Sequence, residues 1–171
     1  MGEKRQAFTL VELLIVVSII GLLLGMVLPS LQRAKQIAAR TVCATNLHAV
    51  AVGFRMYLDD SNDIMPVAAA MPSLKLNDEP RIADVLAPHL GHPETLRCPA
   101  DTEQNFYESE GSSYEYSTML GGRKVGEGFM SRHFGESKTP VMYDYEPFHG
   151  PAGTSGSANY LFADMHVGDL E

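Results

Sequence analysis

A lone carboxylate, Glu12, is the residue whose position in this chain most strongly implies chemistry. It stands in FTLVELLIVVSIIGLLLGMVL, residues 8–28, where no other side chain ionises. About 20 apolar residues, at a rise of 1.5 Å each, span the ~30 Å hydrocarbon layer of a bilayer. An acid in such a span is costly without a partner and is a functional hypothesis by default. The sequence therefore predicts a membrane helix whose carboxylate needs a partner.

Two ordinary interpretations of the amino-terminal segment leave this carboxylate without a role. A secretory signal has an apolar core of roughly 7 to 15 residues and a small-residue cleavage site. Here the core is longer, and the residues at its end, MVLPS at 26–30, lack the A-x-A pattern. An uncleaved signal anchor fits the length, and Lys4 with Arg5 would hold the amino terminus in the cytoplasm. The anchor explains the span and its orientation, but it does not explain Glu12.

The segment AFTLVELL, residues 7–14, resembles the processing site of type IV prepilins and type II secretion pseudopilins. The resemblance implies that prepilin peptidase cleaves between Ala7 and Phe8 and N-methylates Phe8. It also implies that Glu12 meets the new Phe8 ammonium of a neighbouring subunit in a filament. An amine and a carboxylate that are desolvated together attract strongly, whereas each alone is penalised. Ala7 stands where the family usually has Gly.

Four segments follow from this interpretation. Residues 1–7 form a cytoplasmic leader peptide, 8–28 a transmembrane helix, 29–60 its soluble continuation and 61–171 a globular periplasmic or extracellular head. About 140 residues beyond the span suffice for one compact domain and are too few for two. The formal net charge is -8. That balance argues against nucleic-acid binding, which rests on clustered Lys and Arg.

The helix is expected to continue well beyond the membrane. Gly21 and Pro29 stand where the family commonly places residues that loosen the helix, and Pro29 removes one backbone hydrogen bond. The run DDSND at 59–63 predicts the helix end. Between them, apolar or small residues recur at spacings of three and four, which predicts an amphipathic helix with one face in the domain and another against neighbouring subunits: Leu31, Ala34, Ala38, Val42, Thr45, Ala49, Val52 and Met56.

The remaining sequence predicts an α+β fold in which the long amino-terminal helix packs on a small antiparallel sheet. Residues 81–90 have the pattern of a short helix interrupted near Pro88. The stretches 114–119, 141–145 and 159–167 are rich in aromatic and β-branched residues, with Gly and Pro between them, and are predicted strands. The usual architecture of the pilin family agrees with this prediction.

Two cysteines, Cys43 on the helix and Cys98 in the segment RCPAD, would both lie outside the cytoplasm. Disulfides persist there, so a bond between them is the leading hypothesis. The alternative is two buried free thiols, because cysteine is also a small apolar residue.

A second resemblance is to pilin-like proteins abundant in planctomycetes and verrucomicrobia. It rests on Cys43-x-x-Asn46, on the segment RCPAD and on the terminal NYLFADMHV, where Met165 replaces a family Gly. Asp144, His149, Asp164 and His166 are the candidate metal ligands. Asp164 and His166 would face one side of a strand. Calcium, which some major pseudopilins hold, and zinc are the ions considered. Residues of these types are more often turn formers, so no resident cofactor is expected.

The sequence favours a structural subunit of a type IV pilin-like filament, most specifically a pseudopilin of a type II protein secretion system. The alternatives are a type IV pilus subunit for adhesion, motility or DNA uptake, and a membrane-anchored ligand-binding module. No nucleophile elbow, phosphate-binding loop or His-Glu-x-x-His motif points to an enzyme. The expected partners are copies of itself, other pilins or pseudopilins, prepilin peptidase, the assembly platform and the lipid of the bacterial inner membrane. The chain is expected to cross that membrane once, with its amino terminus in the cytoplasm.

Overall fold

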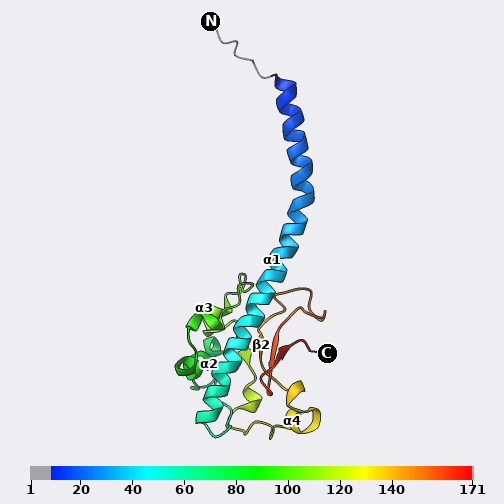
Figure 1. Ribbon diagram of the computed structural model, residues 1–171. Helices are drawn as coiled ribbons and strands as arrows, with labels where there is room; N and C mark the ends of the chain where they lie inside the picture. Colours follow the sequence, from blue (N-terminus) through cyan, green and yellow to red (C-terminus); the bar gives the residue numbers. More distant parts are fainter. Residues whose placement is uncertain (1–8, 171) are drawn as a thin grey trace. The chain divides into compact units, whose positions relative to one another are not determined.

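The structure is a computed structural model that describes residues 9–170, and it has a long helix, three short helices and a four-stranded sheet (Figure 1). The chain divides between Ile37 and Ala38 into two compact units. The elements are α1 (Leu10–Asp60), η1 (Pro72–Leu74), α2 (Ile82–Leu86), η2 (Ala87–His89), η3 (Pro93–Leu96), α3 (Phe106–Glu110), β1 (Tyr114–Tyr116), η4 (Thr118–Leu120), α4 (Phe129–Phe134), η5 (Glu136–Lys138), β2 (Pro140–Asp144), β3 (Tyr160–Phe162) and β4 (Val167–Gly168).

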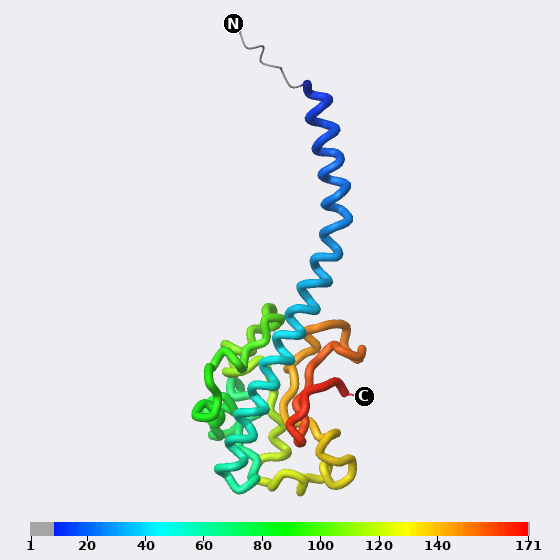
Figure 2. The backbone as a smooth tube through the Cα atoms, viewed as in Figure 1, coloured from blue at the N-terminus to red at the C-terminus, as the bar shows by residue number. Residues whose placement is uncertain are grey.

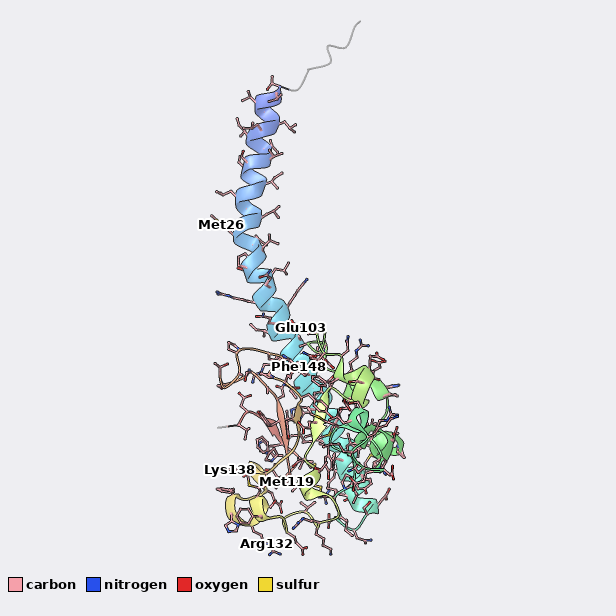
Figure 3. The ribbon with its side chains drawn as sticks, turned by 180° about the vertical axis from the view of Figure 1, so that it is seen from behind. Met26, Glu103, Met119, Arg132, Lys138 and Phe148 are labelled. Carbon is pink, nitrogen blue, oxygen red and sulfur yellow. A yellow bond between two sulfur atoms is a disulfide. The ribbon has the colours of Figure 1, made fainter. Side chains whose placement is uncertain are left out.

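The first unit contains the amino-terminal part of α1, which is long and apolar enough to cross a membrane, with a mean hydropathy of 2.8 over its most apolar window. Its large apolar side chains from Leu10 to Leu28 are 46% to 78% exposed. Figure 3 shows them, Met26 among them, projecting from the helix on all sides. So large an apolar surface needs lipid or another protein to cover it. This part of the helix is therefore suited to anchoring the chain in a membrane.

Polar groups within this apolar part of α1 are satisfied by the helix itself. The Ser18 hydroxyl donates to the carbonyl of Leu14 at 2.7 Å. Helical structure continues on both sides of Pro29, which lies inside α1. Loosening at Pro29 and Gly21 stays a prediction. A helix that leaves few unpaired backbone groups is the form a chain must take in hydrocarbon.

In the second unit, α1 lies in front of β2 (Figure 1) and buries one face in the domain core. The buried positions recur at spacings of three and four, as one face of a helix requires. Tyrosines of β1 and apolar residues of β2 and β3 complete the same core. The core residues of the helix are Cys43, Leu47, Val50, Ala51, Phe54 and Leu58.

The predicted apolar face of α1 is not the face that the domain buries. Val42, Val52 and Met56 are 45%, 63% and 50% exposed, and Thr45 and Ala49 are exposed too. The buried face lies on the opposite side of the helix from this stripe. Both faces carry apolar or small residues, so periodicity found the helix without identifying its inner side. The domain leaves the stripe of Val42, Thr45, Ala49, Val52 and Met56 exposed.

The end of α1 has a hydrogen-bonding pattern that explains where the helix stops. The backbone N–H of Asp63 donates to the carbonyl of Leu58 at 2.9 Å. Asn62 between them has a φ of 55°. This six-to-one bond with a left-handed residue is the Schellman arrangement, in which Asn sometimes takes the place of Gly. The helix accordingly ends at Asp60, inside the run of turn formers at 59–63.

Gly53 permits a close approach between α1 and the segment that follows α2. A Cβ at this position would lie 3.0 Å from the backbone carbonyl oxygen of His89 and 2.8 Å from the Leu90 side chain. The contact partner is the turn η2, where the short helix predicted at 81–90 gives way at Pro88. Any larger residue at position 53 would push this segment away from the helix.

The four strands form one antiparallel sheet in the order β1-β2-β3-β4. Tyr114 pairs with Asp144, and Met142 of β2 pairs with Leu161 of β3. An irregularity between Pro140 and Met142 shifts the register of β2, and both Val141 and Met142 are fully buried. A long helix packed on a small antiparallel sheet confirms the predicted α+β fold.

The predicted strand at 159–167 is two strands with a turn between them. β3 ends at Phe162, and β4 begins at Val167. The N–H of Met165 donates to Phe162 O at 2.9 Å, and Met165 has a φ of 68°. In Figure 2 the last part of the chain, coloured orange to red, doubles back here. The prediction that Asp164 and His166 share one side of a strand is therefore wrong, because alternation does not apply in a turn.

Two buried tyrosines make the domain sensitive to alkali. The Tyr114 hydroxyl donates to Cys43 O at 3.2 Å and that of Tyr116 to Pro66 O at 2.8 Å. Burial raises the pKa of both phenols above the usual value near 10, and Asp144 adds to the rise at Tyr114. Above pH 10 the unfolded chain loses these protons while the folded chain keeps them. Stability is thus complete below that pH and falls as pH rises.

We expect the free energy of unfolding to fall above pH 10 by up to about 1.4 kcal/mol per pH unit for each of the two tyrosines. Tyr116→Phe should remove one tyrosine's share of that slope. Urea unfolding of the full-length protein in detergent, at several pH values between neutrality and about 11.5, measures it. A slope unchanged in Tyr116→Phe would show that this phenol does not titrate on unfolding.

Candidate functional site

Glu12 is held at the start of α1 by Thr9. The Thr9 backbone N–H and hydroxyl donate to Glu12 Oε2 at 2.8 Å and 2.7 Å, and the Glu12 N–H donates to Thr9 Oγ1 at 3.3 Å. This is a capping box, in which residues three apart satisfy each other's free backbone donors. Thr-x-x-Glu is its sequence signature. The sequence analysis did not identify this capping box, because it considered Glu12 only as a charge in an apolar span.

The box gives the carboxylate a partner inside its own chain. Its hydrogen bonds come from neutral groups, so the negative charge itself is not compensated by Thr9. Ala7 and Phe8, the predicted cleavage site, lie outside the described residues. Pairing of Glu12 with a Phe8 ammonium therefore stays a prediction.

In the second unit a disulfide joins α1 to the loop before α3. The sulfurs of Cys43 and Cys98 are 2.00 Å apart, and the Cα atoms are 4.9 Å apart. Both residues are fully buried. Tyr114 and His149 contact this pair, Asn46 bonds to the backbone next to Cys98, and Asp144 contacts His149. We call this group the disulfide junction: Cys43, Asn46, Cys98, Tyr114, Asp144 and His149.

Hydrogen bonds fasten the same two segments beside the disulfide. The Asn46 amide donates to Arg97 O at 2.7 Å, one helical turn beyond Cys43. The Cys43 carbonyl accepts from the Tyr114 hydroxyl of β1. The Cys-x-x-Asn spacing on the helix thus places both side chains against the segment RCPAD. The junction connects the helix, the loop and the sheet.

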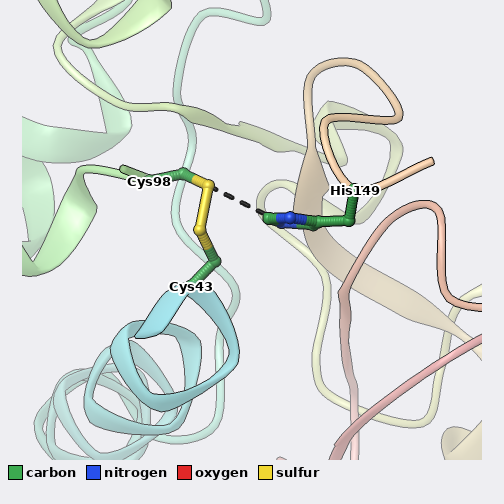
Figure 4. A group of neighbouring side chains, drawn as sticks. All are labelled: Cys43, Cys98 and His149. Carbon is green, nitrogen blue, oxygen red and sulfur yellow. Dashed lines mark hydrogen bonds between the residues drawn. A yellow bond between two sulfur atoms is a disulfide. The ribbon is translucent and has the colours of Figure 1, made fainter. Parts of the chain in front are cut away.

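Asp144 and His149 form a buried pair next to the disulfide. His149 Nε2 is 3.4 Å from Asp144 Oδ2 and 3.6 Å from Cys98 Sγ (Figure 4), and both side chains are at most 1% exposed. Asp144 Oδ2 accepts from the backbone N–H of Asn159 at 2.7 Å and from its amide at 3.2 Å. Among the described residues, Asp144 Oδ1 and His149 Nδ1 have no hydrogen-bond partner.

The four predicted metal ligands separate into two pairs. Asp164 and His166 meet each other in the turn after β3, with 2.5 Å between Asp164 Oδ1 and His166 Nδ1. Within residues 9–170, no third Cys, His or acidic ligand joins that pair. Burial raises the pKa of the Asp164 carboxyl, but the hydrogen bonds from His166 lower it by more, so the pKa lies below its usual range. The pair stabilises the turn between β3 and β4.

Asp101 is a positioning residue that sequence reasoning did not single out. Its carboxylate accepts from the backbone N–H groups of Phe106 and Tyr107 at 3.1 and 3.0 Å, and from the Ser113 hydroxyl at 2.8 Å. It therefore satisfies free donors at the start of α3 and ties the loop after Cys98 to β1. The signal was available, because the segment RCPAD, which was considered for its cysteine, ends on this acid.

Comparison with known proteins identifies similar sequences for the amino-terminal motif and for part of the chain. A family model described as the prokaryotic N-terminal methylation motif matches residues 3–28. The type IV wide pilus major component PilA4 of Thermus thermophilus is 37% identical over 78 residues, which are 46% of this chain and 60% of that protein. The match therefore spans less than two thirds of the relative. No solved structure matches the chain.

These findings agree with the geometry of the two units. The methylation motif covers Glu12 and the exposed apolar part of α1, and the long helix with a small antiparallel sheet is the architecture expected of a pilin. The chain therefore carries the prokaryotic N-terminal methylation motif at residues 3–28 and is similar, over 78 residues, to a type IV pilus component.

Proposed function

We propose that this protein is a structural subunit of a type IV pilin-like filament, anchored in the inner membrane before assembly and held in the filament by its apolar helix. The observation that carries the proposal is the exposed helix of residues 10–28 within a methylation motif. Lipid covers such a helix in the membrane, and neighbouring copies of the helix would cover it in a filament. Prepilin peptidase, cleaving between Ala7 and Phe8, is the processing enzyme in this proposal.

The exposed stripe on the soluble half of α1 supports the same proposal. Val42, Val52 and Met56 lie on a helix whose opposite side is already packed in the core.

In the apolar part of α1, Gly21 and Gly25 are spaced as small-x-x-x-small pairs are at close helix contacts in membranes. A Cβ added at either glycine would meet no atom within 4 Å. Both features provide places where a second helix can approach.

A photo-crosslinking experiment tests assembly through the helix. A benzophenone amino acid at Leu24, which is 52% exposed, should give a ladder of subunit multiples in cells that contain the assembly machinery. The same probe at Leu76, 80% exposed on the head, is the control for random collision. A membrane-anchored binding module would instead remain monomeric. Monomers alone from the Leu24 probe, in cells that process the chain, would refute the filament proposal.

The type of filament is a finer proposal with two candidates. The sequence favours a type II secretion pseudopilus. The Thermus relative is a type IV wide pilus component, which favours a surface pilus on the strength of its aligned 78 residues. Deletion of the gene separates the two. Loss of secreted enzymes with normal surface pili supports the pseudopilus, whereas loss of sheared surface filaments with normal secretion supports the pilus.

A further inference from the structure

The disulfide junction contains the ligand set of a metal site. Within the described residues, Cys43, Cys98 and His149 bring their ligand atoms within 4.8 Å of one another, and Asp144 is in contact with His149. Two thiolates, an imidazole and a carboxylate are ligands that Zn²⁺ accepts in tetrahedral sites. We propose that the reduced chain binds one Zn²⁺ through Cys43, Cys98, His149 Nε2 and Asp144, and that zinc and the disulfide exclude each other.

The distances around His149 already match those of a zinc tetrahedron. Zn–S bonds of about 2.3 Å and Zn–N or Zn–O bonds of about 2.0 Å give S···N edges of ~3.5 Å and N···O edges of ~3.3 Å. The structure has 3.6 Å from His149 Nε2 to Cys98 Sγ and 3.4 Å from Nε2 to Asp144 Oδ2. The sulfurs would have to separate to about 3.8 Å, and the Asp144 carboxylate, which lies outside the group of atoms within 4.8 Å of one another, would have to approach them to about 3.5 Å. Figure 4 shows the imidazole edge directed at the sulfur pair.

The polar groups at the junction are poorly compensated while the disulfide is present. A disulfide sulfur is a weak partner for an imidazole nitrogen, and Asp144 Oδ1 has no hydrogen-bond partner among the described residues. A buried carboxylate is costly unless a cation or several donors face it. Zn²⁺ would supply that cation. The two bonds from Asn159 would orient the Asp144 carboxylate as outer-shell partners of metal ligands do.

The two states of the junction are related by a balanced redox reaction. Both cysteines are synthesised as thiols, and binding of Zn²⁺ releases their two protons. A disulfide donor then oxidises the two thiolates to the S–S bond, and it becomes a dithiol by taking their two electrons and two protons from water. Zn²⁺ is released, because no thiolate remains to hold it. Zinc would therefore hold the junction together in the newly made chain until oxidation makes the link covalent.

A metal titration of the full-length protein in detergent tests this proposal. A trialkylphosphine reduces the disulfide and becomes the phosphine oxide with oxygen from water. After removal of excess phosphine, Co²⁺ replaces Zn²⁺ as the probe. We expect one equivalent to bind the reduced protein with sulfur-to-cobalt charge-transfer absorption, Zn²⁺ to displace it, and the oxidised protein to give no such absorption. Equal Co²⁺ binding by both redox states would overturn the proposal.

His149→Gln identifies the third ligand, and its disulfide-bonded form reports separately whether the variant folds. We expect its affinity for Co²⁺ in the reduced state to fall at least tenfold. His92→Gln, at an exposed position on the head, is the matched control and should bind as the wild type does. An unchanged affinity and spectrum in His149→Gln would refute the assignment.

A second measurement needs no variant. Zn²⁺ should slow alkylation of both cysteines in the reduced wild-type protein at least tenfold, and a chelator should restore the rate. Alkylation that Zn²⁺ does not slow would count against the site even if Co²⁺ bound elsewhere. Failure of either test leaves the filament proposal intact, because subunit assembly involves a different part of the chain.

Discussion

Glu12→Ala should insert into the membrane and be cleaved like the wild type, yet enter filaments at least tenfold less efficiently. Removal of one partner from a desolvated ion pair costs several kcal/mol, and each ~1.4 kcal/mol is a factor of ten in an equilibrium. The Phe8 ammonium of the neighbouring subunit would lose its counter-charge. The ratio of filament-bound to membrane-bound subunit in sheared material measures the effect, with cleavage followed by the change in subunit mass.

The capping box of Thr9 and Glu12 makes a sharper version of this experiment available. Glutamine can take the place of glutamate in a capping box but carries no charge. Glu12→Gln should therefore keep the helix start and still fail to assemble. Thr9→Ala removes the local partner and leaves the carboxylate, at a cost of about 1 kcal/mol, and should assemble. Normal filaments from Glu12→Gln would show that capping, rather than charge, is what assembly needs from this residue.

The long helix could be predicted because its signals are local and strong. A 21-residue apolar span, a run of periodic residues and a cluster of turn formers at 59–63 define it without any tertiary information. Its inner face could not be predicted, because the helix carries apolar residues on both sides, with Val42 in the exposed stripe and Cys43 on the buried face. The sheet-facing partners decide which of them is buried, and those partners are more than 50 residues away in sequence.

The candidate sites divide in the same way. Pairing of Asp164 with His166 follows from the turn between β3 and β4, and a predicted continuous strand hid that turn. The junction of Asp144 and His149 with the disulfide depends on the distance between β2 and α1, which no spacing in the sequence expresses. The sequence could nominate His149 as a metal ligand but not place it beside Cys98. Long-range packing supplied the missing information.

Replacement of both cysteines by alanine should lower the free energy of unfolding by about 4 kcal/mol in the chain-entropy account, because the bond closes a loop over a sequence separation of 55 residues. For a domain of this size the midpoint of thermal unfolding should fall by on the order of 10 °C. Alanine is the proper replacement, since a serine hydroxyl would be buried at both positions. Thermal unfolding in detergent, with a chelator present, measures the loss.

Reduction separates the crosslink from the side chains that form it. A phosphine should destabilise the wild type by a similar amount and leave Cys43→Ala/Cys98→Ala unchanged, and intact mass after alkylation should show no free thiol in unreduced wild type. Two alkylated cysteines in unreduced protein would remove the bond itself. If the free energy of unfolding of the double variant lay within about 1 kcal/mol of the wild-type value, the disulfide would not be what holds the helix to the loop. That role would fall to Asn46 and Tyr114, whose hydrogen bonds connect α1 to the same loop and to the sheet. The expected loss is larger than two such hydrogen bonds supply, at about 1 kcal/mol each, so the two explanations predict different unfolding curves.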